Sequence, residues 1–134
     1  MKPQYEIKYK QFVFVPKKPK MSKGKIASQV AHATFLALEK QREIIFKSTG
    51  SYATTDSIIG AWKKSGMCVI VLECRDTQHL NDIATYLDQW DIPNHLYIDE
   101  GLTEVAPMTP TALATGVLPL SKHWMLSQFK LFKG

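Results

Sequence analysis

The sequence predicts an α/β fold, a three-layer α/β/α sandwich built around a four-stranded mixed β-sheet. Two observations lead to this prediction. The chain has 134 residues, of which 45% are hydrophobic, and this suits one domain that buries its own core. Its patterns follow the order strand, helix, helix, strand, helix, strand, strand, and strands joined through long helices must lie parallel. We also expect at least one antiparallel edge strand.

The first half of the chain is predicted to hold one strand and one long helix. The β-branched and aromatic run at 11–15 predicts a strand that Pro16 ends. Residues 17–21 form a loop, and Ser22 is the expected N-cap of a helix that runs to about Phe46, with a break near its end. Apolar residues at helical spacing predict the buried stripe of that helix: Ile26, Val30, Ala33 and Ala37.

The second half alternates polar runs with apolar segments. The run 67–74 is almost wholly apolar, which is typical of a strand covered on both faces. In chain order, the expected elements are a polar loop (47–55), a short helix (56–65), a strand (67–74), a helix (77–90), a strand (94–98), a loop (99–110), a strand (111–117) and a short strand or packed tail (128–132). No repeat or linker divides the chain, so we expect a single domain over residues 1–134, in which residues 1–10 can form a flexible basic N-terminal extension.

The positive charge of the chain is concentrated at its N-terminal end. The net charge is +5, yet residues 1–25 hold eight lysines and one acid, whereas the remaining residues hold nine bases and eleven acids. Clustered lysines are typical of a protein that binds a phosphate-rich partner. A solvated basic leader without a partner explains the charge equally well at this point.

Composition also limits the compartment and the class of protein. Apolar runs are far shorter than the roughly 18 residues of a membrane span, so no membrane partner is expected. The lysine-rich start does not resemble a signal peptide. Two cysteines cannot build a disulfide framework. These features predict a cytoplasmic protein.

The segment Lys20–Lys25 joins the first strand to a helix N-terminus. Free backbone N–H groups and the helix dipole favour an anion there, and lysines are electrostatically unfavourable in a first helical turn. Three lysines within six residues therefore indicate a function, although the glycine spacing of a P-loop is missing. Lys25, Gln29 and His32 lie at i, i+4 and i+7, which predicts one polar helix face away from the apolar stripe. That face is either a site or simply solvated.

The loop from Asp99 to Pro110 is the second candidate. A carboxylate that leaves the end of a strand is well positioned to orient or deprotonate a water molecule. Threonine hydroxyls at Thr103, Thr109 and Thr111 can hold a carbonyl or ribose oxygen. An Asx-type turn rich in β-branched residues is the alternative. The histidines show no ligand-like spacing with cysteines or acids, so we expect no metal site.

Together the two segments resemble the type 2 peptidyl-tRNA hydrolase family, the archaeal and eukaryotic type. Residues 20–33 (KMSKGKIASQVAHA) match the helix-opening motif of that family almost position for position. Residues 99–109 (DEGLTEVAPMT) resemble its aspartate, glycine and threonine loop. The segment 113–116 and the closing Lys130–Phe132 also fit, so the likeness spans about residues 11–133.

The resemblance implies an enzyme that hydrolyses the ester between peptide and tRNA and so recycles tRNA from stalled translation, which is ribosome rescue. It implies a small cytosolic α/β protein without a cofactor, with peptidyl-tRNA as its partner. Members are often dimeric, so a homodimer is compatible with it. The catalytic residues of the family correspond to Lys25, Asp99, Thr103 and Thr111. Its substrate-binding positions correspond to Lys20, Ser22, Lys23, Gln29, His32 and Thr109.

Three positions depart from the family pattern. The segment Pro16–Lys18 stands where an Arg-Ser/Thr-Asp segment is usual, and Glu104 replaces a glutamine. Met108 replaces a glycine, and we expect it either to crowd the pocket or to prevent a left-handed turn. These departures leave a second hypothesis open, namely a catalytically weak or inactive tRNA- or protein-binding module with the same fold.

Overall fold

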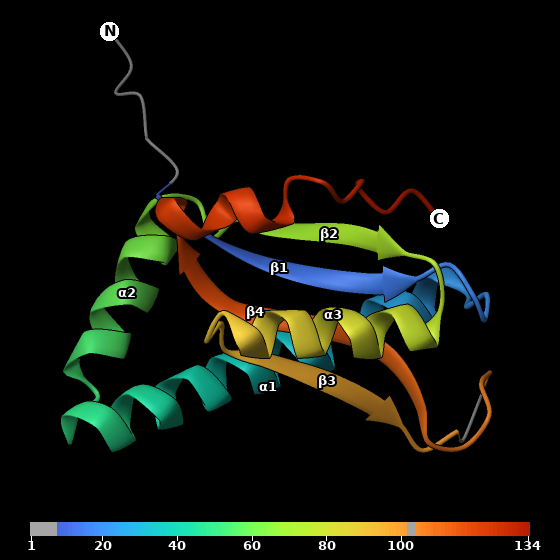
Figure 1. Cartoon of the computed structure of the whole chain (residues 1–134), viewed down its shortest axis with the longest axis horizontal. Coiled ribbons are helices and arrows are strands. Elements are labelled where there is room, and N and C mark those ends of the chain that lie inside the picture. The colour runs from blue at the N-terminus through green and yellow to red at the C-terminus, as the bar shows by residue number, and fades with distance from the viewer. Residues whose placement is uncertain (1–7, 102–103) are drawn as a thin grey trace, which may run out of the picture.

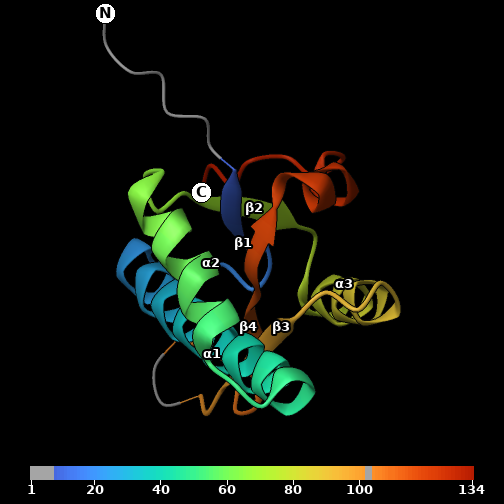
Figure 2. The same cartoon turned by 90° about the vertical axis from the view of Figure 1, so that its left-hand side faces the viewer.

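The structure, a computed structural model, describes residues 8–101 and 104–134 (Figure 1). Within these residues four strands form one mixed sheet: β1 (Tyr9–Pro16), β2 (Val69–Cys74), β3 (Asn94–Asp99) and β4 (Thr109–Pro119). Helices α1 (Lys23–Thr49) and α2 (Ala53–Lys64) cover one face of the sheet, and α3 (Thr77–Gln89) covers the other (Figure 2). The expected three-layer α/β/α sandwich is confirmed.

The antiparallel strand of the sheet is internal. The strand order is β2-β1-β4-β3, in which β1 and β2 are parallel and β4 is antiparallel to both of its neighbours. The expectation of an antiparallel edge strand is therefore wrong. Eight of the eleven residues of β4 are buried, and a strand this apolar is best covered when helices shield both faces and neighbours pair with both edges.

A second consequence of this topology concerns the edge where the loops meet. Strands β1, β2 and β3 run in the same direction, so their carboxyl ends lie at the same end of the sheet, where β4 begins (Figure 1). This end, as distinct from the outer strands, is called the carboxyl edge. The loops that follow β1, β2 and β3 therefore come together at this carboxyl edge. In α/β sheets such an edge is the usual place for a ligand.

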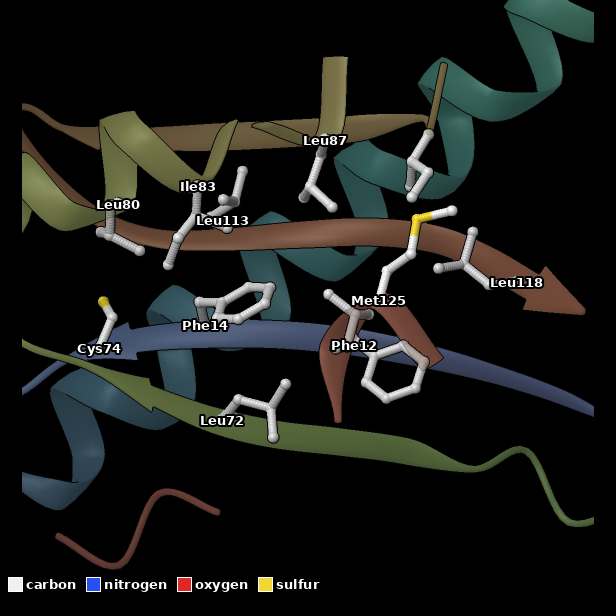
Figure 3. Close-up of a cluster of buried hydrophobic side chains, with 12 residues drawn as sticks. Phe12, Phe14, Leu72, Cys74, Leu80, Ile83, Leu87, Leu113, Leu118 and Met125 are labelled. Carbon is white, nitrogen blue, oxygen red and sulfur yellow. The ribbon is translucent and has the colours of Figure 1, made fainter. Parts of the chain in front are cut away.

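The larger hydrophobic core lies between the sheet and α3. Figure 3 shows Phe12 and Phe14 of β1 facing Leu80, Ile83 and Leu87 of α3. The 3₁₀-helix η1 (Leu120–Leu126), which the sequence patterns did not indicate, closes one end of this core with Met125. Burial of several large apolar side chains here supplies most of the hydrophobic stabilisation of the fold.

The buried stripe of α1 is more polar than predicted. Ser22 caps the helix as expected, and the helix continues without the expected break to Thr49, where Gly50 ends it with φ 73°. Ile26 and Val30 are only half-buried. The buried positions follow a spacing of four residues: Gln29, Ala33, Ala37 and Gln41. Glutamine is tolerated inside because each amide finds hydrogen-bond partners in β4, which offsets the cost of its desolvation.

Strand β2 lies at the edge of the sheet, so the expectation that both of its faces are fully covered is wrong. Val69 is exposed, and only Leu72 and Cys74 are buried. The C-terminal tail lies along its free side, where Leu131 forms an antiparallel bridge with Leu72. This agrees with the expected packed tail and removes part of an otherwise open strand edge.

The remaining boundaries differ from the predicted ones by a few residues at most for each element. Tyr9 and Lys10, which were expected in the N-terminal extension, belong to β1, and Lys8 is exposed just before it. The rest of that extension, residues 1–7, lies outside the described residues. No helix in the described part of the chain has the length and apolar character needed to cross a membrane.

Candidate active site

The ion pair between Lys25 and Asp99 is the centre of the candidate site. Asp99 is the last residue of β3, and Lys25 lies in the first turn of α1. The Lys25 ammonium donates to Asp99 Oδ1 at 3.0 Å, and the two side chains are only 10% and 11% exposed. The second oxygen, Oδ2, accepts the Gly101 N–H at 2.9 Å. Two residues 74 positions apart are thus brought together at the carboxyl edge.

The surroundings of Asp99 keep its carboxyl ionised. Burial by itself raises the pKa of Asp99, but the hydrogen bond from Lys25, the Gly101 N–H and the nearby His32 outweigh this effect. The pKa of Asp99 therefore lies below its ordinary value of 3.8. The site consequently presents a fixed negative and a fixed positive charge side by side at neutral pH.

A neutral hydrogen bond lies next to this ion pair. Thr111, at the start of β4, is fully buried, and its hydroxyl donates to Gln29 Oε1. Gln29 is one turn beyond Lys25 on α1 and is 2% exposed. The expectation that Lys25, Gln29 and His32 share a face turned away from the core is therefore wrong for Gln29. Helical spacing alone could not reveal that β4 offers this amide a hydroxyl partner.

Glu104 completes the N-terminal cap of α1 from another part of the chain. Its Oε1 accepts the Ser22 N–H at 2.7 Å, and its Oε2 accepts the Ser22 hydroxyl. Ser22 Oγ in turn accepts the Lys25 N–H. In an ordinary capping box a glutamate three residues after the cap accepts the N–H of the capping residue. Lys25 occupies that position here, so the carboxylate comes from the β3–β4 loop instead.

The cap contact also affects the charge of Glu104. The Ser22 hydroxyl and N–H, together with the nearby Lys25, hold the pKa of Glu104 below its ordinary range. Sequence reasoning noted Glu104 only as a departure from a family pattern. The signal that could have revealed its role was Ser22-Lys23-Gly24-Lys25, a cap motif with a cation at the position of the expected acid.

The β3–β4 loop has a conformation that only certain residues allow. Gly101 has φ 78°, and a Cβ there would lie 2.4 Å from the backbone of Pro107. Met108 has φ 62° and its side chain is 69% exposed. The expectation that Met108 prevents a left-handed turn or crowds the site is therefore wrong. Thr109 Oγ1 donates to the Ala106 carbonyl at 2.6 Å and so stiffens the end of the loop.

The other predicted positions lie around this centre. Lys20 and Lys23 are exposed beside the helix N-terminus. His32 is also exposed, and its ring stacks on Tyr97 of β3 with the centroids 4.8 Å apart. Thr103, expected among the catalytic residues, lies outside the described residues.

Cysteine chemistry does not account for this site. Burial, followed by the charge of Asp76, raises the pKa of Cys74 to about 12, so this side chain remains a thiol at neutral pH. Cys68 precedes β2 instead of lying within it. The groups brought together at the carboxyl edge are an ammonium, a carboxylate and hydroxyls, which suit the activation of water and the stabilisation of an oxyanion.

Comparison with known proteins agrees with this arrangement. Residues 9–132 match the family model described as "Peptidyl-tRNA hydrolase PTH2". The chain belongs to this family. Three relatives named "Peptidyl-tRNA hydrolase" illustrate the similarity. The protein of Methanopyrus kandleri is 32% identical over 108 residues, which cover 81% of this chain and 84% of the relative.

The other two are similarly close. The protein of Thermococcus onnurineus is 33% identical over 115 residues, covering 84% of this chain and 86% of the relative. The protein of Staphylothermus marinus is 35% identical over 118 residues, covering 85% and 86%. Because the match includes nearly all of β1 through the C-terminal tail, the peptidyl-tRNA hydrolase family accounts for the whole described domain.

Proposed function

We propose that this protein hydrolyses the ester bond between the peptide and the tRNA of peptidyl-tRNA, and so returns tRNA from stalled translation. The observation that carries the proposal is the Lys25–Asp99 ion pair at the carboxyl edge of a member of the peptidyl-tRNA hydrolase family. An ester at this edge would meet a cation and an anion in fixed positions, without a metal or a cofactor.

The proposed reaction is a direct attack by water. Asp99 orients the water and accepts its proton while the water oxygen bonds to the ester carbonyl carbon. Negative charge develops on the carbonyl oxygen, and the Lys25 ammonium stabilises it. The bond from the carbonyl carbon to the ribose oxygen then breaks, and that oxygen takes up the proton. The products are a tRNA with a free terminal hydroxyl and a peptide carboxylic acid, which releases its remaining proton to solvent and becomes a carboxylate.

The low pKa of Asp99 has a consequence for this scheme. An aspartate held ionised by Lys25 is a weak base in the free protein. When Lys25 turns toward the developing oxyanion, Asp99 loses part of that stabilisation and becomes a stronger base. The ion pair would therefore serve as a resting state that separates as the ester enters.

The remaining residues have supporting parts in the proposal. Thr111, whose buried hydroxyl donates to Gln29 in the absence of substrate, is proposed to exchange that hydrogen bond for one to an ester oxygen when the ester binds beside the ion pair. Thr103 is proposed as a further catalytic hydroxyl, and Thr109 as a substrate contact. Four more positions at or near the N-terminal end of α1 are proposed to contact the substrate: Lys20, Ser22, Lys23 and His32.

Release of free tRNA from peptidyl-tRNA tests the proposal. We expect turnover by the wild type, and a loss of about 10²–10³-fold in kcat for Lys25→Ala, since this variant removes the oxyanion donor. Lys63→Ala, on the exposed last turn of α2, is the matched control and should keep full activity. If the wild type binds tRNA but releases none, the chain is the catalytically inactive binding module, and the proposed function is wrong.

Two further proposals concern the setting. We propose that the protein acts in the cytoplasm, where ribosomes produce the substrate. A homodimer remains a prediction, supported by the exposed Trp90 and Trp124, whose rings lie edge to face at 6.0 Å. Light scattering coupled to gel filtration measures the mass in solution, and a monomer at all concentrations would refute the dimer.

A further inference from the structure

The carboxyl edge of the sheet is divided into a basic half and an acidic half. The basic half follows β1 and β2, where exposed cations come from three separate segments. The acidic half is the β3–β4 loop, since residues 99–109 contain three acids and no lysine or arginine. The Lys25–Asp99 pair lies where the two halves meet, because Lys25 belongs to the first and Asp99 to the second.

The basic half contains three neighbouring hollows. One cavity of about 350 Å³ lies between the lysine loop and the C-terminal tail, with Lys20 and Lys23 at its rim. Two neighbouring hollows of about 230 and 340 Å³ include Arg75 after β2, and the first of these also includes Lys130 of the tail. Lys17 lines all three. The three hollows therefore adjoin one another around Lys17, from beside α1 to the ends of β1 and β2, and together they make up the basic depression.

The charges of this depression are not cancelled by its own acids. Its described lining holds six cationic side chains and two carboxylates. Glu73 lies 3.6 Å from Lys17, an exposed pair of small energetic effect. Asp76 caps α3 by accepting the His79 N–H at 2.9 Å. Arg75, Lys130 and Lys18 are exposed, and no ion pair is formed by any of the three among the described residues.

We propose that the RNA of the substrate lies over the β1–β2 half of the carboxyl edge, with Arg75 and Lys130 as phosphate contacts, and that the peptide leaves over the β3–β4 loop. The inference rests on the proposed function and adds to it the side of the site on which the RNA and the peptide of the substrate lie. A phosphodiester chain is attracted by the connected cations and repelled by Glu100 and Glu104 on the other half. The backbone of a peptide has no charge at each unit, so a peptide can pass over the acidic loop.

Neither Arg75 nor Lys130 was a candidate site residue in the sequence analysis, although Lys130 begins the closing segment 130–132 that fits the family pattern. Arg75 is brought to the edge because β2 ends beside β1, and Lys130 because the tail pairs with β2, where its carbonyl accepts the Glu73 N–H at 2.9 Å. Only the fold adds these two cations to the lysines of the β1–α1 loop.

The test compares two charge-reversed pairs. Arg75→Glu with Lys130→Glu changes the basic half, and Lys63→Glu with Lys64→Glu makes the same change of charge on α2, at the opposite end of the molecule (Figure 1). Binding of deacylated tRNA is measured between about 50 and 200 mM salt, because each lost phosphate contact lowers the slope of log K against log salt by about 0.9. For the Arg75 and Lys130 pair we expect the affinity for tRNA to fall at least tenfold. We also expect the magnitude of the slope of log K against log salt to fall by about one to two.

Kinetics separate binding from chemistry. For the Arg75 and Lys130 pair we expect a higher KM for peptidyl-tRNA, an unchanged kcat, and unchanged hydrolysis of an N-acetylaminoacyl ester of adenosine, which has no acceptor stem. The milder Arg75→Gln with Lys130→Gln should move the KM and the slope in the same direction. Unchanged thermal unfolding shows that each variant is folded.

Two results would overturn the inference. One is an equal loss of affinity in the α2 pair, which would mean that net charge alone matters. The other is a larger gain in affinity from Glu100→Gln than the loss from the basic-half variants, which would put the RNA over the acidic loop. A wild type that hydrolyses neither peptidyl-tRNA nor the adenosine ester would refute the proposed function. The tRNA-binding measurements on the charge-reversed pairs would still show which half of the edge the RNA contacts.

Discussion

The two ends of the buried face of α1 use the same residue type for different purposes. Gln29 lies near the first turn and accepts from the hydroxyl of Thr111, beside the ion pair. Gln41, twelve residues later, donates to the Val117 carbonyl at 2.9 Å and accepts the Val117 N–H at 2.9 Å. The buried positions of α1 between these two glutamines are Ala33 and Ala37.

The difference between the two glutamines lies in their partners. Gln41 pairs with both the N–H and the carbonyl of Val117, which are backbone groups that cannot ionise, so its amide is satisfied inside the fold at both its oxygen and its nitrogen. Gln29 pairs with a side chain at the end of a strand, next to charged groups that a substrate can reach. A buried polar contact therefore indicates chemistry here only where its partner is a side chain at the carboxyl edge.

Asp99→Asn removes the negative charge of the ion pair that lies near Gln29, and it should have the largest effect on turnover. We expect a loss of about 10²–10⁴-fold in kcat, since the group that orients and deprotonates the water is removed. Peptidyl-tRNA turnover measures this, and Glu100→Gln serves as the neighbouring control. Retention of full turnover by Asp99→Asn would remove Asp99 from the mechanism.

Acid titration of unfolding provides a second measurement on the same variant. The pKa of Asp99 is lower in the folded protein than its ordinary value of 3.8. Its ionised form therefore contributes stability that is present above pH 3.8 and is lost as the pH falls through the lower folded value. We expect the wild type to lose stability more steeply than Asp99→Asn below pH 3.8. Parallel curves would contradict this contribution.

Thr111→Val tests the neutral contact beside the ion pair and should have the next largest effect. The change leaves the buried Gln29 amide without its hydroxyl partner, at a cost of about 1–3 kcal/mol in the free energy of unfolding. Turnover should fall as well. Thr111→Ser keeps the hydroxyl and should retain most activity, whereas equal losses in the two variants would indicate that only side-chain volume matters.

Glu104→Ala should have a smaller effect on turnover, below about tenfold in kcat/KM, because the contact with Ser22 is exposed to solvent. The Ser22 N–H loses its acceptor and the start of α1, which carries Lys25, becomes less ordered. Glu104→Gln keeps an acceptor for that N–H and should restore most of the loss. Amide hydrogen exchange at residues 22–25 measures the order directly, and unchanged exchange in Glu104→Ala would contradict this role.

Gln41→Leu should leave turnover unchanged. That outcome would show that Gln41 stabilises the fold only, whereas Gln29 lies beside the reacting groups. The variant removes both hydrogen bonds to Val117, so we expect the free energy of unfolding to fall by about 1–3 kcal/mol. Chemical denaturation measures the loss, and Glu39→Gln on the exposed side of α1 is the control. A specific loss of kcat in Gln41→Leu would show that the two ends of the helix are coupled.

Local patterns were sufficient to predict the four strands, the three α-helices and the two motifs, although not the 3₁₀-helix η1. Ser22 was recognisable as a cap, and the strands and helices follow from the periods of their apolar residues, which depend only on near neighbours in the chain. The family motifs at 20–33 and 99–109 identified Lys25 and Asp99 before any geometry was known. The internal position of β4 was not predictable in this way, because strand order depends on competition between edges that are far apart in the sequence.

By itself, the sequence determined the fold class, the cluster of lysines at the N-terminal end and the residue types of the site. Only the tertiary structure decided which polar groups pair: Lys25 with Asp99, Gln29 with Thr111, and Glu104 with Ser22. For the two buried pairs, Lys25 with Asp99 and Gln29 with Thr111, the physical reason is that a polar side chain becomes buried only where a partner from another segment compensates its lost hydration. That partner is chosen by the packing of the sheet against α1, and no local pattern contains it.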